Sequence, residues 1–159
     1  MTVQAVPDGY HTVTPYLIIN GAAQAIEFYK SAFAATEVVR MPDPKGRIGH
    51  AELKIGDSFI MLADEHAEMG YRGPRTLGGT SVSIVLYVPD VDTVFARALK
   101  AGGKSQRAVA DQFYGDRSGT LEDPFGHVWT IATHVEDVPP EELKRRAEAV
   151  MRTTPPANS

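Results

Sequence analysis

The chain has 159 residues, 43% of them hydrophobic, with a net charge of −4 and no cysteine. This is enough apolar material for one domain, or for two modules that share a core, while the acidic balance argues against nucleic acid and the missing cysteines exclude disulfides and thiol chemistry. Because the N-terminus has no signal-peptide pattern and no apolar run approaches the ~20 residues of a membrane span, we expect a cytoplasmic protein without a membrane partner.

The first half of the chain predicts one strand, one helix and three further strands. Residues 11–20 are β-branched and apolar, which is typical of a strand, although Pro15 removes one backbone donor and favours a sheet edge or a bulge. Apolar side chains then recur every three or four residues over 21–35, which predicts an amphipathic helix. The remaining strands are expected at 36–41, 48–55 and 58–63, followed by a glycine-rich, aperiodic linker that can serve as a lid.

The second half repeats this order. An apolar strand is expected at 80–88, and Asp90 is placed to cap a helix that ends at Gly102. A weak strand, a loop and a hairpin are expected at 104–108, 108–115 and 117–131, with Asp123-Pro124-Phe125-Gly126 as the hairpin turn. A final helix is expected at about 139–151, and residues 153–159 are expected to be disordered.

Matching residues in the two halves support an internal repeat. Gly56 and Glu52 recur as Gly126 and Glu122, at an offset of 70 residues in both cases. The sequence therefore predicts an α+β fold of two βαβββ modules, at about 11–64 and 80–134, with a linker at 65–79 and a C-terminal helix.

Five segments between residues 11 and 152 carry a family resemblance. They are Pro15-Tyr16-Leu17, Ala25 to Phe33, His50-Ala51-Glu52-Leu53, Val88-Pro89-Asp90-Val91-Asp92 and Asp111 to His134. With them the chain resembles the vicinal oxygen chelate superfamily, which contains glyoxalase I, extradiol dioxygenases and the fosfomycin- and bleomycin-resistance proteins, and more closely its PhnB-like branch. The resemblance implies curved mixed sheets around a shared cavity, helices on the convex side, and a homodimer with its modules side by side or exchanged.

The resemblance also implies where a metal would bind. Enzymes of the superfamily take one ligand from the first and one from the last strand of each module, and these positions fall near Thr14, Ile60, Ser83 and Thr130. Three hydroxyls and one apolar side chain lack the carboxylate or imidazole donors that hold a divalent ion tightly. We therefore expect neither this metal nor another cofactor.

Strand alternation gives an independent prediction of the cavity lining. If Ala51, Leu53 and Ile55 face the helices, the cavity receives the side chains between them and their counterparts in the repeat, namely His50, Glu52, Lys54, Thr120 and Glu122. Hydroxyl side chains are expected to join them from the other strands, namely Thr14, Tyr16, Ser83 and Thr130. Trp129 and Ile131 are expected to face the helices as core.

His50, Glu52 and Glu122 are the candidate acid–base groups, because shielded neighbouring carboxylates shift in pKa and histidine titrates near neutral pH. Alternatively, His50 is a hydrogen-bonded strand residue, the two glutamates are solvated, or the three form a displaced metal site. Ligand contacts are expected from the cavity hydroxyls and from a loop that closes the cavity, carrying Phe113, Tyr114 and Arg117. There Arg117 would bind an anion, or else pair with Asp116 at the surface.

Three functions remain open from the sequence. The leading hypothesis is a PhnB-like protein that binds a small polar molecule in its cavity and catalyses lyase- or isomerase-like proton transfer through His50 with Glu52 or Glu122. The second is a non-catalytic protein that sequesters a small molecule. The third is a metalloenzyme with non-standard ligands.

Overall fold

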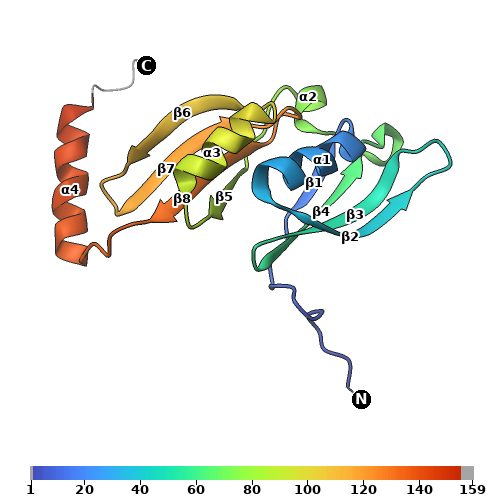
Figure 1. Cartoon of the computed structure of the whole chain (residues 1–159), viewed down its shortest axis with the longest axis horizontal. Helices are drawn as coiled ribbons and strands as arrows, with labels where there is room; N and C mark the ends of the chain where they lie inside the picture. The colour runs from blue at the N-terminus through green and yellow to red at the C-terminus, as the bar shows by residue number, and fades with distance from the viewer. Residues whose placement is uncertain (1, 155–159) are drawn as a thin grey trace.

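A computed structural model describes residues 2–154, which form two similar halves and one additional helix (Figure 1). The first half contains β1 (Tyr16–Ile19), α1 (Ala22–Phe33), β2 (Thr36–Pro42), β3 (Ile48–Ile55) and β4 (Ser58–Asp64). The second half contains β5 (Ser83–Tyr87), α3 (Val91–Lys100), β6 (Lys104–Asp111), β7 (Asp116–Glu122) and β8 (Val128–His134), and α4 (Pro140–Thr153) follows it. None of the helices among these residues is long and apolar enough to cross a membrane.

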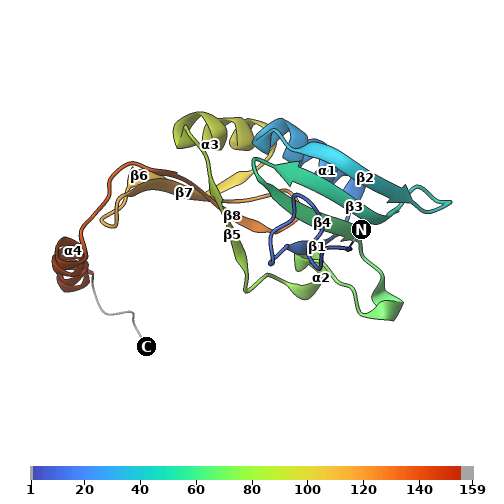
Figure 2. The same cartoon turned by 90° about the horizontal axis from the view of Figure 1, so that it is seen from below.

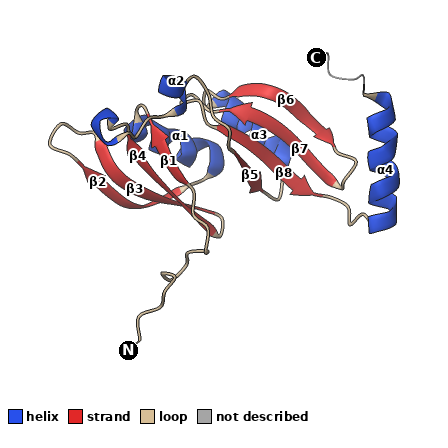
Figure 3. Ribbon diagram, turned by 180° about the vertical axis from the view of Figure 1, so that it is seen from behind, coloured by secondary structure: helices blue, strands red, loops and turns tan. Residues whose placement is uncertain are grey.

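Each half builds one mixed four-stranded sheet in the same order. The orders are β1-β4-β3-β2 and β5-β8-β7-β6, and in both sheets the first strand pairs in parallel with the last while the other pairs are antiparallel. Helices α1 and α3 lie on the same side of the two sheets, and the opposite faces are free of long helices (Figures 2 and 3). The α+β fold of two βαβββ units predicted from the repeat is therefore confirmed.

The structure differs from the predicted elements in several places, including β5, which is shorter than 80–88, and β8, which runs beyond residue 131. Strand β1 begins at Tyr16 rather than at residue 11, because Pro15 has no backbone donor and contributes only its carbonyl, which accepts a 2.9 Å hydrogen bond from the Met61 backbone N–H. The linker is not aperiodic, since it contains η1 (Ala67–Met69) and α2 (Pro74–Leu77). Strand β6 runs on through pairing with β7, so the loop expected at 108–115 shrinks to 112–115. Helix α4 ends at Thr153, and the rest of the tail expected to be disordered lies largely outside the described residues.

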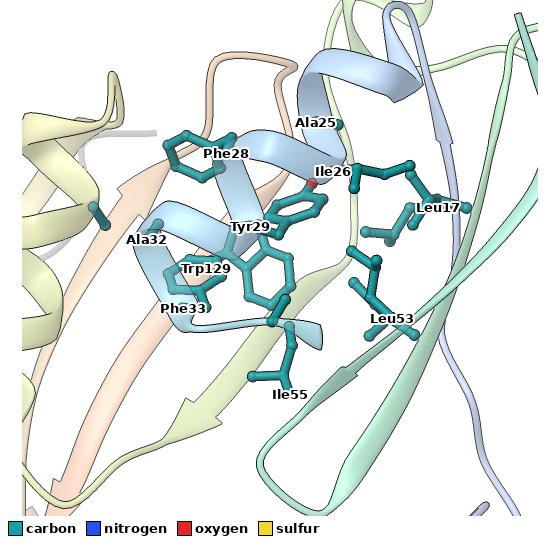
Figure 4. Close-up of a cluster of buried hydrophobic side chains, with 14 of the residues drawn as sticks. Leu17, Ala25, Ile26, Phe28, Tyr29, Ala32, Phe33, Leu53, Ile55 and Trp129 are labelled. Carbon is teal, nitrogen blue, oxygen red and sulfur yellow. The ribbon is translucent and has the colours of Figure 1, made fainter. Parts of the chain in front are cut away.

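The two halves share one hydrophobic core beneath α1 (Figure 4). Alternation places Ala51, Leu53 and Ile55 on the helix side of β3, as predicted, and all three are buried. Trp129 of the second half is also buried, and its ring centroid lies 5.3 Å from that of Tyr29 and 4.7 Å from that of Phe33, both on α1. Helix α1 therefore packs on the sheets of both halves.

A buried carboxylate reinforces this junction. Asp123, at the β7–β8 turn, accepts hydrogen bonds on Oδ1 from the backbone N–H groups of Phe125 and His127, at 2.9 and 3.0 Å. Its Oδ2 accepts a 2.6 Å bond from the Tyr29 hydroxyl and a 3.0 Å bond from the Trp129 indole. Burial and the neighbouring carboxylate raise the pKa of Tyr29 well above its usual value, so its hydroxyl remains a donor. Asp123 thus stabilises the junction as well as the local turn.

Candidate functional site

His50 and Glu52 lie on the face of the first sheet opposite α1, which we call the helix-free face. There they belong to a continuous hydrogen-bonded chain. The Tyr16 hydroxyl lies 2.8 Å from His50 Nδ1, and His50 Nε2 lies 3.0 Å from Glu52 Oε1. The Tyr10 hydroxyl donates to the other Glu52 oxygen. Strand register explains the grouping, because Tyr16 pairs with Met61 on β4 and Met61 pairs with Glu52 on β3.

The direction of these hydrogen bonds follows from the charge on Glu52. Hydrogen bonds from His50 and Tyr10 lower the pKa of Glu52, so the group is ionised at neutral pH and can only accept. His50 Nε2 must then carry the proton that it shares with Glu52. In the neutral imidazole this leaves Nδ1 as the acceptor for the Tyr16 hydroxyl, whose pKa is raised by burial, Tyr71 and Glu52. Both ring nitrogens of His50 are therefore engaged, and Tyr16 carries the outermost exchangeable proton.

Tyr16 also lines a cavity of about 450 Å³ between the first sheet and the linker. The sheet contributes mainly apolar lining, including Ile18, Ile48 and Ala63. The linker folds over the opening, where His66 and Tyr71 exchange backbone hydrogen bonds of 2.9 and 3.1 Å around η1. The linker segment expected to act as a lid thus forms a wall of this cavity.

The cavity-facing residues of the second half make their contacts elsewhere. The Thr120 and Thr130 hydroxyls lie 3.0 Å apart, on the helix-free face as expected. Glu122 does not join His50, because it pairs with Arg75 of α2 at 3.2 Å and accepts a 3.2 Å hydrogen bond from Gln106.

The two remaining hydroxyl candidates lie near the first strand of each half. Ser83 lines a neighbouring cavity of about 660 Å³ between β1 and β5, and Tyr16 lines this cavity as well as the first. Thr14 is half-buried in the segment before β1, so the strand position expected for it does not exist.

The loop expected to close the cavity is located elsewhere. Phe113 and Tyr114 form the β6–β7 turn, with their ring centroids 5.3 Å apart, and the Phe113 carbonyl accepts a 3.3 Å hydrogen bond from Arg146 of α4. Arg117 is a residue of β7 that points to the α3 side, where it pairs with Asp92 at 2.8 Å and Asp111 at 3.1 Å. The carboxylate partners of Arg117 are therefore Asp92 and Asp111, and the alternative pair with Asp116 is not formed.

The residues that the superfamily uses for metal binding do not fit a divalent ion in this chain. Ile60 faces the core and is 4% exposed, whereas its neighbour Met61 shares the helix-free face with Glu52. Methionine and the hydroxyls of Thr14, Ser83 and Thr130 are poor ligands for hard cations. Within residues 2–154, no three His, Cys, Asp or Glu side chains gather at a distance suited to a metal, which also removes the displaced site that His50 and the two glutamates could have formed.

The structure contains two polar groups that the sequence does not predict. Tyr10 lies in a short polar segment whose pattern predicts only a tail. The second group is a chain in the other half, in which buried Asp116 accepts a 2.7 Å hydrogen bond from Tyr87 and lies 2.8 Å from His134 Nδ1. His134 Nε2 lies 2.8 Å from Asp137, and the Asp137 and Asp116 carboxylates raise the pKa of His134. Tyr87 and His134 are each 18 or more residues away from Asp116 in the sequence, so no local sequence pattern indicates this group.

Comparisons with known proteins agree with this architecture. Protein Mb0911c of Mycobacterium bovis is 44% identical over 135 residues, which cover 83% of this chain and 89% of that protein. Protein PA1353 of Pseudomonas aeruginosa has a crystal structure that matches with a TM-score of 0.64 and 27% identity, over 79% of this chain and 99% of the other. The PhnB protein of Bacillus cereus shares the fold, with a TM-score of 0.62 and 20% identity over 77% and 99% of the two chains. The sequence profile of the Glyoxalase/Bleomycin resistance protein/Dioxygenase superfamily matches residues 10–131, and the chain belongs to this superfamily.

Proposed function

We propose that the protein binds a small polar molecule in the 450 Å³ cavity and moves a proton to or from it through Tyr16, His50 and Glu52. The observation that carries this proposal is the hydrogen-bonded chain from Glu52 through His50 to Tyr16, which ends on the cavity wall. An ionised acid that orients a neutral imidazole, which in turn accepts from a hydroxyl, is the arrangement that makes a hydroxyl group reactive in many enzymes.

The proton would move in a relay. A proton leaving the ligand binds the Tyr16 oxygen while the Tyr16 proton moves to His50 Nδ1. The Glu52 carboxylate, 3.0 Å from His50 Nε2, stabilises the imidazolium that forms. Return of the proton to a different ligand atom gives an isomerisation, and loss of a neighbouring group gives an elimination. Glu122 has no part in this relay because Arg75 and Gln106 hold it.

Solvent deuterium exchange tests the proposal directly. In D₂O, the protein should incorporate deuterium next to the carbonyl group of a compound drawn from a panel of small hydroxyaldehydes, hydroxyketones and 2-oxo acids, as read by proton NMR. Tyr16→Phe and His50→Ala should each slow this exchange by about 10²–10⁴-fold, the usual contribution of general acid–base groups. Tyr87→Phe is the matched control. Like Tyr16, Tyr87 donates a hydrogen bond from the first strand of its sheet, but it lies in the other half and its acceptor is the Asp116 carboxylate.

The second candidate function is binding without catalysis, which the largely apolar sheet wall of the cavity supports. A panel compound that raises the melting temperature and gains no deuterium would favour sequestration over proton transfer. In that case Tyr16→Phe should weaken binding while the ligand is recovered unchanged.

We also infer a homodimer in which α4 contacts the second copy. No side chain of helix α4 is fully buried, and the helix exposes Leu143, Val150 and Met151. A stripe of this kind is usually covered in a stable protein. Sedimentation velocity of the purified protein should give a dimer mass, and Met151→Glu should shift it towards the monomer; a wild-type monomer would contradict the inference.

A further inference from the structure

The N-terminal arm places an aromatic ring on the same face of the first sheet as the proton relay. Residues 7–10 form a tight turn, in which the Tyr10 backbone N–H donates to the Pro7 carbonyl at 3.0 Å and Gly9 has a φ of +81°. The Tyr10 ring stacks on Phe59 of β4, with ring centroids 4.1 Å apart and ring planes at 14°. A Cβ at Gly9 would lie 3.2 Å from Phe59, so glycine lets the turn approach the ring closely.

Three groups on neighbouring strands form the surface that receives Tyr10, and we call them the Phe59 shelf. Phe59 is its floor. Lys54, its register partner on β3, holds its ammonium 5.7 Å from the Phe59 centroid, and Glu52 accepts the Tyr10 hydroxyl hydrogen bond. The shelf therefore offers an aromatic face, a cation at its side and a hydrogen-bond acceptor at its end.

The arm is anchored by few contacts. Residues 2–9 are exposed and belong to no helix or strand, and Tyr10 is the one half-buried residue of the described arm up to residue 13. The neighbouring His11 makes only a 3.6 Å contact with the exposed Asp57. Undocking Tyr10 would thus disrupt little of the remaining structure.

We propose that Tyr10 occupies a ligand subsite, and that a planar aromatic molecule carrying a hydroxyl group displaces it, stacks on Phe59 and donates a hydrogen bond to Glu52. The subsite rests on the proposed function in one respect, because Glu52 belongs to both. The requirement for a hydroxyl donor to Glu52 limits the ligands of this subsite to neutral phenols. An aromatic carboxylate would bring a second negative charge against Glu52.

The state of the Tyr10 hydroxyl supports this choice of ligand. Partial burial, the hydrogen bond to Glu52 and the charge of Glu52 raise the pKa of Tyr10 to about 12. A phenol on the shelf is subject to the same effects and stays protonated at neutral pH. While Tyr10 is bound to the Phe59 shelf, the shelf cannot accept a ligand. The arm therefore lowers the apparent affinity for any ligand that must displace Tyr10.

Binding of 2-naphthol, followed by its fluorescence, tests the proposal on the full chain. Tyr10→Ala should bind 2-naphthol about tenfold more tightly than the wild type, as expected if the arm leaves roughly one site in ten open. His11→Ala, which alters the arm beside the shelf, should match the wild type. Phe59→Ala in the Tyr10→Ala background should remove the gain, with circular dichroism confirming that each variant is folded.

The hydroxyl requirement is tested with 2-methoxynaphthalene, which stacks equally well but cannot donate a hydrogen bond. On the Tyr10→Ala protein it should bind about tenfold more weakly than 2-naphthol, because removal of the arm favours both compounds equally and only 2-naphthol can donate a hydrogen bond to Glu52. Equal affinity of the two compounds would overturn the role of Glu52. Equal affinity of wild type and Tyr10→Ala for 2-naphthol would overturn the subsite itself. These results are distinguishable from a failure of the proton relay, because 2-naphthol binding does not require Tyr16 or His50 to transfer a proton.

Discussion

Replacing Asp123 with alanine is expected to lower the free energy of unfolding by about 3–5 kcal/mol, because several buried donors lose their only strong acceptor. The Tyr29 hydroxyl and the Trp129 indole both donate to Asp123 Oδ2, and both side chains are almost completely buried. Water cannot reach these two donors without opening the junction between the halves. Urea unfolding followed by the fluorescence of Trp129, the single tryptophan of the chain, measures the loss.

Asp43 provides a matched control within the same chain. It also follows a strand and accepts hydrogen bonds from backbone N–H groups two and four residues later, at 2.8 Å from Lys45 and 2.9 Å from Arg47. It lacks buried side-chain donors, so Asp43→Ala should cost only about 1 kcal/mol. If Asp123→Ala costs no more than Asp43→Ala, Asp123 acts only as a turn residue, as its place in the Asp-Pro-Phe-Gly motif suggested.

The sequence correctly predicted which face of a sheet each of several side chains occupies, because alternation along a strand is a local property. His50 and Glu52 lie on the helix-free face and Trp129 and Ile131 lie in the core, as expected from period-two patterns and the repeat. Contacts between distant segments were beyond such patterns. Tyr16 and His50 are 34 residues apart, and Tyr29 and Asp123 are 94 residues apart.

The errors at the site have two physical causes. The weak strand pattern before Arg117 predicts a loop there. In the structure, pairing with β7 extends β6 to Asp111 and directs Arg117 towards Asp92. The repeat relates the strand positions of Glu122 and Glu52, and this predicts that the two side chains line one cavity. A repeat fixes which face a residue occupies but not its neighbours, and α2 of the linker brings Arg75 to Glu122.

Trp129→Ala is expected to lower the free energy of unfolding by about 3–5 kcal/mol, the usual cost of removing a large aromatic side chain from a core. Trp129 is 1% exposed and lies against Tyr29 and Phe33 of α1, so its truncation leaves a cavity inside the core. Trp129→Phe keeps an aromatic ring at the position and should cost clearly less, although it still removes the donor to Asp123. Chemical denaturation followed by circular dichroism gives both values.

Because Trp129 lies between the halves, the effect of Trp129→Ala on each half separately is more informative than the total loss of unfolding free energy. Because Trp129 is on β8 and its aromatic partners are on α1, its removal weakens the contact between the halves more than either sheet. The wild type should unfold in one transition, while Trp129→Ala should show different protection from hydrogen exchange in the two halves. The Trp129→Ala and Asp123→Ala losses should also be non-additive, since both act through Tyr29. Additive losses, with equal protection in both halves, would mean that the α1–α3 contact holds the halves together without Trp129.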